Sequence, residues 1–168
     1  MTTTENKPET VFGQSMRRKE DRHLITGQTK WTDNIVLPGM LHVAFLRSPI
    51  AHARITVDTT PAKSYPGVVG VYSAADFGAS QGLLADAWTC HPDMIKPENP
   101  PLATDEVRYA GEPIAVVVAE TRYQANDALE GIMVDYDPLP AVTDLEGALE
   151  AGADLVHTSK GTNQCYTL

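Results

Sequence analysis

The sequence predicts an α+β domain with a mixed β-sheet and a few packed helices. Three observations support this: a continuous apolar run at residues 114–119, several segments in which polar and apolar residues alternate, and one clear amphipathic helix pattern. The run shows no polar alternation, which is typical of a strand covered on both faces, and its valines favour a strand over a buried helix. Gly111-Glu112-Pro113 before it predicts a turn, because glycine accepts positive φ and proline starts a strand without a ladder donor.

The remaining strands are predicted from alternation and from bounding turn residues. Leu41, Val43 and Phe45 alternate with their neighbours in a strand that Ser48-Pro49 ends. Near the end of the chain, Asp135 and Asp137 are expected to point outward. The predicted strands are residues 40–47, 53–58, 68–72, 107–110, 114–119 and 132–136.

The clearest helix begins at Thr121, which forms a capping box with Gln124. Its apolar stripe of Ala125, Ala128, Leu129 and Ile132 is expected to pack on the sheet. Shorter helices are predicted in three places: about two turns after Thr60-Pro61, residues 74–77 behind a Ser73 and Asp76 capping box, and residues 145–150 capped by Thr143 with Glu146. Trp31 is expected to anchor its segment in the core.

Length and breaker residues suggest one domain with loose ends. We expect a flexible N-terminal arm at 1–15, the domain at 16–157, and a tail or linker at 158–168. Residues 78–104 have no usable period and contain four prolines, and an irregular segment of this length is usually functional or an interface arm.

The formal net charge is −9, with two basic and nine acidic residues in 120–168, so nucleic acid is a poor partner. The basic cluster Arg17-Arg18-Lys19 with Arg22 is diluted by acidic neighbours and is interpreted as a solvated or subunit-contacting segment. The sequence has no secretory signal pattern and no run long enough to span a membrane, which predicts a cytoplasmic protein. Two distant cysteines indicate neither a zinc knuckle nor a disulfide framework.

Motifs for common catalytic chemistry are missing from the sequence. It has no glycine-rich phosphate loop and no serine-hydrolase elbow. None of the five histidines pairs at ligand spacing, and His52, beside the Ser-Pro turn, is interpreted as structural. Asp135 with Asp137 is interpreted as a solvated edge rather than an acid and base pair, and Glu112 as a cap for its own turn rather than a proton carrier.

An ordered series of short motifs resembles the start of the large subunit of molybdenum hydroxylases, with the carbon monoxide dehydrogenase type nearest and xanthine dehydrogenase and aldehyde oxidase related. The resemblance covers residues 16–157. Its main motifs are Arg17-Arg18-Lys19-Glu20-Asp21, Leu24-Ile25-Thr26-Gly27, Leu37-Pro38-Gly39-Met40-Leu41-His42, Arg47-Ser48-Pro49, Ala51-His52-Ala53-Arg54-Ile55, Gly111-Glu112-Pro113 and Tyr136-Asp137-Pro138-Leu139-Pro140.

The resemblance implies an α/β hammerhead domain in a cytoplasmic oxidoreductase. It implies a holoenzyme that uses molybdopterin with molybdenum in this large subunit, with iron-sulfur and FAD on two partner subunits. No catalytic, cofactor-binding or metal-binding residue can be carried over, so we expect a non-catalytic structural or assembly module that is inactive alone, either an excised domain or part of a split large subunit. The candidate structural or interface residues are Arg17, Arg18, Arg47, Ser48, His52, Gly111, Glu112 and Pro113.

Two other functions remain open from the sequence. A stand-alone small-molecule binding module would use the long loop 78–104 with Trp88, provided that a pocket forms there. A self-contained hydrolytic enzyme would use Glu112, or Asp135 with Asp137. The substrate of the holoenzyme cannot be read from these residues.

Overall fold

A computed structural model of the chain describes residues 12–84, 91 and 93–167. The chain divides into two units, residues 1–40 and residues 41–168. The first contains one short helix, α1 (Asp21–Ile25), and one 3-10 turn, η1 (Thr32–Asn34). None of its described residues is buried, and Trp31 is 61% exposed, so the expectation that Trp31 anchors a core is wrong. Turns this short present no continuous apolar stripe under which a core could form.

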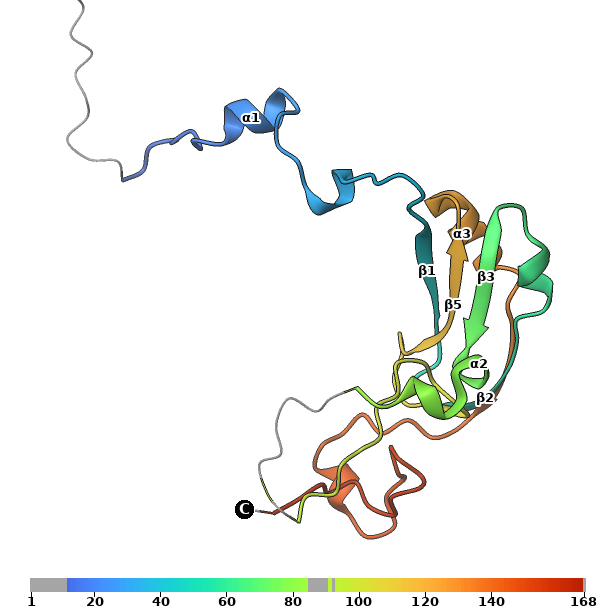
Figure 1. The fold of residues 1–168 in the computed structure, drawn as a ribbon. Coiled ribbons are helices and arrows are strands. Elements are labelled where there is room, and N and C mark those ends of the chain that lie inside the picture. The colour runs from blue at the N-terminus through green and yellow to red at the C-terminus, as the bar shows by residue number, and fades with distance from the viewer. Residues whose placement is uncertain (1–11, 85–90, 92, 168) are drawn as a thin grey trace, which may run out of the picture. The chain divides into compact units, whose positions relative to one another are not determined.

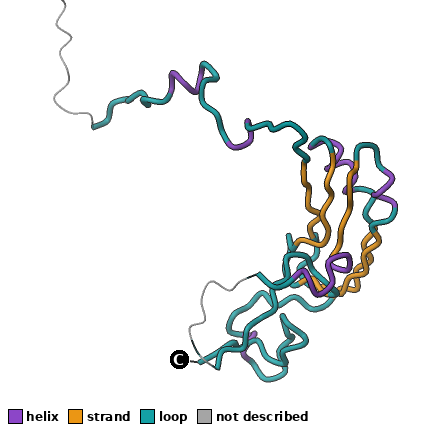
Figure 2. The backbone as a smooth tube through the Cα atoms, viewed as in Figure 1, coloured by secondary structure: helices purple, strands orange, loops and turns teal. Residues whose placement is uncertain are grey.

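In the described residues of the second unit, six strands form two antiparallel sheets where a single mixed sheet was expected (Figure 1; Figure 2). The first sheet has the order β1-β5-β3 and the second has the order β4-β2-β6. Their bounds are β1 (His42–Arg47), β2 (Ala53–Asp58), β3 (Val68–Ser73), β4 (Glu106–Val107), β5 (Pro113–Ala119) and β6 (Met133–Pro138).

The apolar run forms the central strand, β5, between β1 and β3. Phe45 of β1 pairs with Val116, and Tyr72 of β3 pairs with the same valine on its other side. The alternative of a buried helix is therefore wrong, because the run finds ladder partners on both edges. The strand predicted at 107–110 is shorter than expected: it ends at Val107, and the chain then turns at Gly111, whose φ is +94°.

The helix that follows β5 is α3 (Arg122–Leu129), capped as predicted by the Thr121 hydroxyl, which accepts from the Gln124 amide at 3.3 Å. The other segments are α2 (Ala74–Phe77) and three 3-10 turns, η2 (Pro61–Ser64), η3 (Gly78–Gln81) and η4 (Gly147–Leu149). The Ser73 and Asp76 capping box of α2 is confirmed, with the Ser73 amide donating to Asp76 Oδ2 at 2.7 Å.

Two of the shorter helix predictions need correction. The two helical turns expected after Pro61 are a single 3-10 turn. It ends at Ser64 because Pro66-Gly67 follows closely and cannot continue a helix. The helix expected at 145–150 is the 3-10 turn η4, whose N-cap position is Glu146, and the side chain that bonds its first amide comes from Asp144 rather than Thr143. The Asp144 carboxylate accepts from the Gly147 amide at 2.7 Å.

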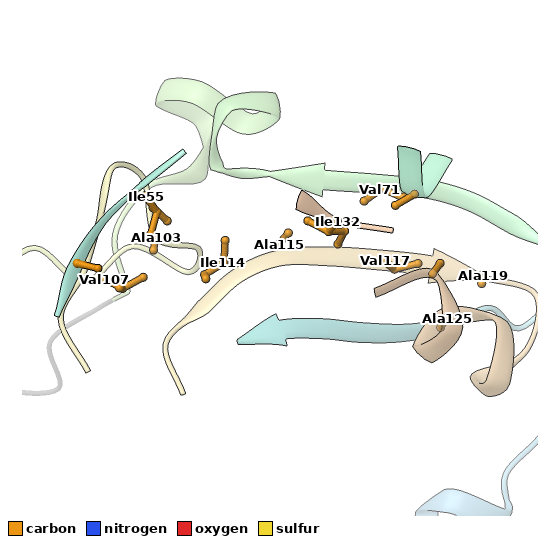
Figure 3. Packing of buried hydrophobic residues seen from close by; sticks show 13 residues of the cluster. Ile55, Val71, Ala103, Val107, Ile114, Ala115, Val117, Ala119, Ala125 and Ile132 are labelled. Atoms are coloured by element: carbon orange, nitrogen blue, oxygen red, sulfur yellow. The ribbon is translucent and has the colours of Figure 1, made fainter. Parts of the chain in front are cut away.

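The core joins the inner faces of both sheets with α3 and the loop before β4. Val71, Val117 and Ala119 form one end of it, where Ala125 of α3 packs beside β5 (Figure 3). Ile114 lies toward the other end, where Figure 3 also shows Ile55, Ala103 and Val107. The buried cluster is Ala53, Ile55, Ala62, Val71, Ala103, Val107, Ile114, Ala115, Val117, Ala119, Ala125, Ala128 and Ile132.

This arrangement confirms the α+β fold class. Small alanines at 125 and 128 let α3 approach the sheet closely, as its predicted stripe requires. Among the residues that the structure describes, no helix has the length and apolarity needed to cross a membrane.

Candidate functional site

The structure brings the predicted Arg-Ser motif and the Gly-Glu-Pro turn together at one end of the β1 and β5 ladder. Arg47 Nη1 donates to the Gly111 carbonyl at 2.8 Å. The Ser48 amide donates to the Glu112 carbonyl at 2.9 Å, and the Gly111 amide donates to the Ser48 carbonyl at 2.7 Å. Arg47 is also the ladder partner of Pro113, next to a register irregularity. Five of the eight predicted residues therefore form one junction.

The polar side chains of this junction are engaged with nearby backbone. Ser48 is buried, and its hydroxyl donates to the Ile50 carbonyl at 2.7 Å while accepting from the Ile50 amide at 3.1 Å. Glu112 is buried too, and its Oε2 accepts from the Arg108 amide at 2.5 Å. Glu112 therefore caps its own turn, as the sequence predicted.

Arg17 and Arg18 lie in the first unit. The Arg18 amide donates to Asp21 Oδ2 at 3.2 Å, so this hydrogen bond is local to the start of α1. The expectation that these two arginines contact a partner remains a prediction.

A second polar cluster lies under the edge of the second sheet, around the carboxylate of Glu106, which is only 5% exposed. His52 Nε2 lies 3.0 Å from Glu106 Oε1, and the Thr158 hydroxyl donates to Glu106 Oε2 at 2.7 Å. Arg108 Nε is 3.7 Å from Glu106 Oε1. The other ring nitrogen of His52 lies 2.6 Å from the Pro140 carbonyl, so His52 joins β4 to the segment after β6.

The electrostatics of this cluster favour an ionised glutamate. Burial alone raises the pKa of Glu106, but hydrogen bonds from His52 and Thr158 and the positive charge of Arg108 outweigh it, and the net pKa lies below its ordinary value of 4.5. Burial is also the main reason why the pKa of His157 is lowered, and the nearby Arg108 adds to it. The His157 Nδ1 atom is buried without a hydrogen-bond partner among the described residues.

A cavity of about 390 Å³ opens beside this cluster. Its walls come from the loop after α2, from the segment 98–108 and from the tail, so three distant stretches meet there. Glu98, Asp105 and Glu106 contribute more acidic than basic groups to the lining, and Arg108 is the basic one. Part of the loop 78–104 thus lines a cavity, which is the condition set for the small-molecule alternative, and Trp88 lies outside the described residues.

His52 was predicted as structural, and both of its ring nitrogens do contact protein groups. Glu106, Arg108 and Thr158 were missed. The available signal for Glu106 was a charged residue directly before an apolar strand residue, Val107, since such a side chain must find partners if it is buried. No local pattern marks Thr158, which reaches Glu106 across 52 positions of sequence.

The two aspartates of the hydrolytic alternative are exposed strand residues. Asp135 and Asp137 lie on the outward face of β6, and Asp137 pairs across the ladder with Arg54 at 3.6 Å with both side chains well exposed. In the described part of the chain, no three histidine, cysteine, aspartate or glutamate side chains gather as a metal site would require.

Replacing Thr158 with valine is expected to loosen the tail from the cluster. The change keeps the side-chain volume but removes the hydroxyl that donates to Glu106, and a hydrogen bond to a charged group contributes about 1.5–3 kcal/mol. We expect amide hydrogen exchange in residues 155–160 to become faster, with a smaller loss of global stability. Thr143→Val on an exposed position is the matched control, and equal exchange in both variants would contradict the role of Thr158.

Comparison with known proteins gives one consistent result. The profile of the family described as "Aldehyde oxidase and xanthine dehydrogenase, a/b hammerhead domain" matches residues 26–140. The chain is 38% identical over 143 residues to the nicotine 6-hydroxylase large subunit of Paenarthrobacter nicotinovorans, covering 84% of this chain and 17% of that protein. It is also 38% identical over 157 residues to the carbon monoxide dehydrogenase large chain of Afipia carboxidovorans, covering 92% of this chain and 19% of that one.

Among solved structures, quinoline 2-oxidoreductase from Pseudomonas putida 86 superposes with a TM-score of 0.69 at 45% identity, covering 83% of this chain and 18% of that chain. The chain thus spans about a fifth of the length of the curated relatives it matches. The similarity covers the two sheets and α3, and it extends into the first unit from residue 26.

Proposed function

Because the chain belongs to the a/b hammerhead domain family of aldehyde oxidases and xanthine dehydrogenases, we propose that it is a structural and assembly module of a molybdenum hydroxylase. The module is non-catalytic by itself. The holoenzyme oxidises carbon monoxide, an aldehyde or an N-heterocycle, because the relatives are named for carbon monoxide, nicotine and quinoline as substrates.

The observation that supports this proposal is that buried polar side chains form hydrogen bonds within the fold itself. Ser48, Glu112, His52 and Glu106 are all buried, and each has its hydrogen-bonding atoms directed at backbone or at another member of the same clusters. Buried polar groups that are hydrogen-bonded within the fold hold loops in position. A positioning role in a larger enzyme fits this better than a separate active site.

The partners of the module are the remainder of the molybdenum-binding large subunit, an iron-sulfur subunit and a flavin subunit. We place molybdopterin with molybdenum in that remainder, and iron-sulfur and FAD on the two other subunits. We also propose that the assembly is cytoplasmic. Domain limits of 16–157 with a flexible arm at 1–15 and a linker at 158–168 are part of the same proposal, as are interface roles for Arg17 and Arg18.

The test compares the chain alone with a split enzyme. The large chain of the Afipia carboxidovorans carbon monoxide dehydrogenase is produced without its 157 matched residues, together with its own partner subunits, and with or without this chain. We expect the chain alone to contain no molybdenum and to oxidise nothing, and we expect it to restore a stable complex in the split enzyme. Molybdenum bound to the isolated chain together with substrate oxidation would refute the proposal.

A stand-alone small-molecule binding module remains the second candidate, and the cavity of about 390 Å³ favours it. A thermal-shift screen separates the two. Stabilisation of the chain by a small ligand, without binding to the truncated large chain, would support this second function and oppose the first.

A further inference from the structure

The first sheet has one face that α3 and the core cover and one face that they leave open, which we call the outer face. The antiparallel registers place Phe45, Val116 and Tyr72 in one row across it. Val43 and Val118 are in the next row. The outer face is thus apolar on all three strands that Figure 1 shows side by side.

The side chains of the outer face are substantially exposed. Val43 is 53% exposed, Phe45 is 47% and Tyr72 is 39%. Phe77 of α2 extends the surface, because its ring centroid lies 5.8 Å from that of Tyr72. Single exposed apolar residues are common, but a contiguous group spanning several elements indicates a contact surface.

The sequence of β5 supports the same conclusion independently. Its run of apolar residues has no polar alternation, which is typical of a strand buried on both faces. The structure buries Ala115, Val117 and Ala119 completely but leaves Val116 and Val118 partly open. An antiparallel sheet with one face in water would instead have polar residues at those two positions. The composition of β5 therefore fits a face that a partner covers.

The outer face also contains a recess. A cavity of about 380 Å³ is lined by Phe45, Phe77, Pro101, Leu102 and Val116. Its walls are mainly apolar side chains, and the volume suits one large aliphatic or aromatic side chain. Binding energy in protein interfaces concentrates at such pockets, where one buried anchor excludes water.

The net charge of the second unit disfavours two possible partners for the outer face. Residues 41–168 contain seven basic and seventeen acidic residues, so two copies of this unit, or the unit and an anionic lipid surface, repel each other. A polypeptide without this acidic excess meets no such penalty. Relatives contain this fold within a chain about five times as long, which supplies a polypeptide surface beside it.

Building on the proposed function, we propose that the outer face docks against the remainder of a molybdenum hydroxylase large subunit, and that one apolar side chain of that remainder enters the recess. The interface is centred on Phe45 and the recess, with Val43 and Tyr72 on either side. It is a packing surface and takes no part in the chemistry.

The experiment measures the affinity of the 168-residue chain for the truncated Afipia carboxidovorans large chain described above. Phe45→Asp places a charge at the centre of the face, and Ser80→Trp fills the mouth of the recess from an exposed position. We expect each variant to raise Kd about tenfold or more. Met133→Asp is the matched control, because Met133 is a 62% exposed strand residue of the second sheet. Its Kd should stay within about twofold of the unsubstituted chain.

The outcomes separate the two proposals. If the unsubstituted chain does not bind, the proposed function fails. If it binds and both outer-face variants bind equally well, the proposed function stands and this inference is overturned. If Phe45→Asp does not fold, as judged by its thermal unfolding curve, Ser80→Trp decides. A concentration-dependent dimer of the chain alone that Phe45→Asp dissociates would identify a second copy as the occupant and would also overturn the inference.

Discussion

Replacing Ile114 with alanine is expected to lower the free energy of unfolding by about 3 kcal/mol. Ile114 is fully buried and is one of the largest side chains without solvent contact in the described core. It lies in the same cluster as Ile55 of β2, Val107 of β4 and Ala103 of the loop before β4. Removing three carbon atoms loses their transfer free energy and leaves a cavity that the β-sheets cannot close fully, and such changes cost about 2–5 kcal/mol.

The measurement is urea-induced unfolding followed by circular dichroism. Leu145→Ala is the control, because Leu145 is 89% exposed and its truncation should change stability by no more than about 0.5 kcal/mol. Ile114→Val should fall between the two, at about 1 kcal/mol. Equal stability of Ile114→Ala and Leu145→Ala would show that β5 is not the centre of the core.

Local sequence signals predicted β5 and α3 because each signal is satisfied within a few residues. The apolar run of β5 has valines that prefer a strand whatever neighbours it meets. The Thr121 cap bonds to a backbone amide three positions away, so its role is readable without a fold. Both elements were therefore predicted with nearly correct bounds.

The failures share a different cause. An exposed Trp31 and a buried one have the same sequence neighbours, and whether a tryptophan enters a core depends on tertiary packing. Thr143 and Asp144 are both good caps, and only the backbone path decides which one reaches the Gly147 amide. Such alternatives differ by small local energies, and tertiary structure decides between them.

The candidate site shows the same contrast between residues that local motifs predicted and residues that only the fold brings together. The junction of Arg47 and Ser48 with Gly111 and Glu112 was anticipated through motifs, although their mutual contact across 64 positions was not. Glu106 and Thr158 carried no motif, because their partnership exists only after β4 joins β2 and the tail folds back. Long-range polar clusters of this kind form only in the folded chain, so the periodicity of the sequence cannot predict them.

Replacing Glu106 with alanine is expected to destabilise the second unit by about 3 kcal/mol. The change removes the acceptor for His52 and for the Thr158 hydroxyl, and it leaves Arg108 without its carboxylate. Breaking a buried charged pair by removing one partner costs about 3–5 kcal/mol, and unmet hydrogen-bonding groups add to the cost. Thermal unfolding of Glu106→Ala beside Glu120→Ala, on an exposed position, measures the effect.

The same glutamate predicts how stability depends on pH. Its pKa in the folded chain lies below the ordinary value of 4.5, so the unfolded chain binds more protons between the two values. The contribution of Glu106 is therefore complete above pH 4.5 and is lost as the pH falls through the lower, folded value. The lowered pKa of His157 acts in the same direction below its ordinary value of 6.5.

Glu106→Gln removes the ionising carboxylate and keeps the size of the side chain. We expect the stability of the unsubstituted chain to fall on acidification below pH 4.5 by more than that of Glu106→Gln. Urea unfolding at a series of pH values gives both slopes. Identical slopes below pH 4.5 would mean that the carboxylate of Glu106 is not held ionised by His52, Thr158 and Arg108, and the buried cluster would then have no part in fixing the tail.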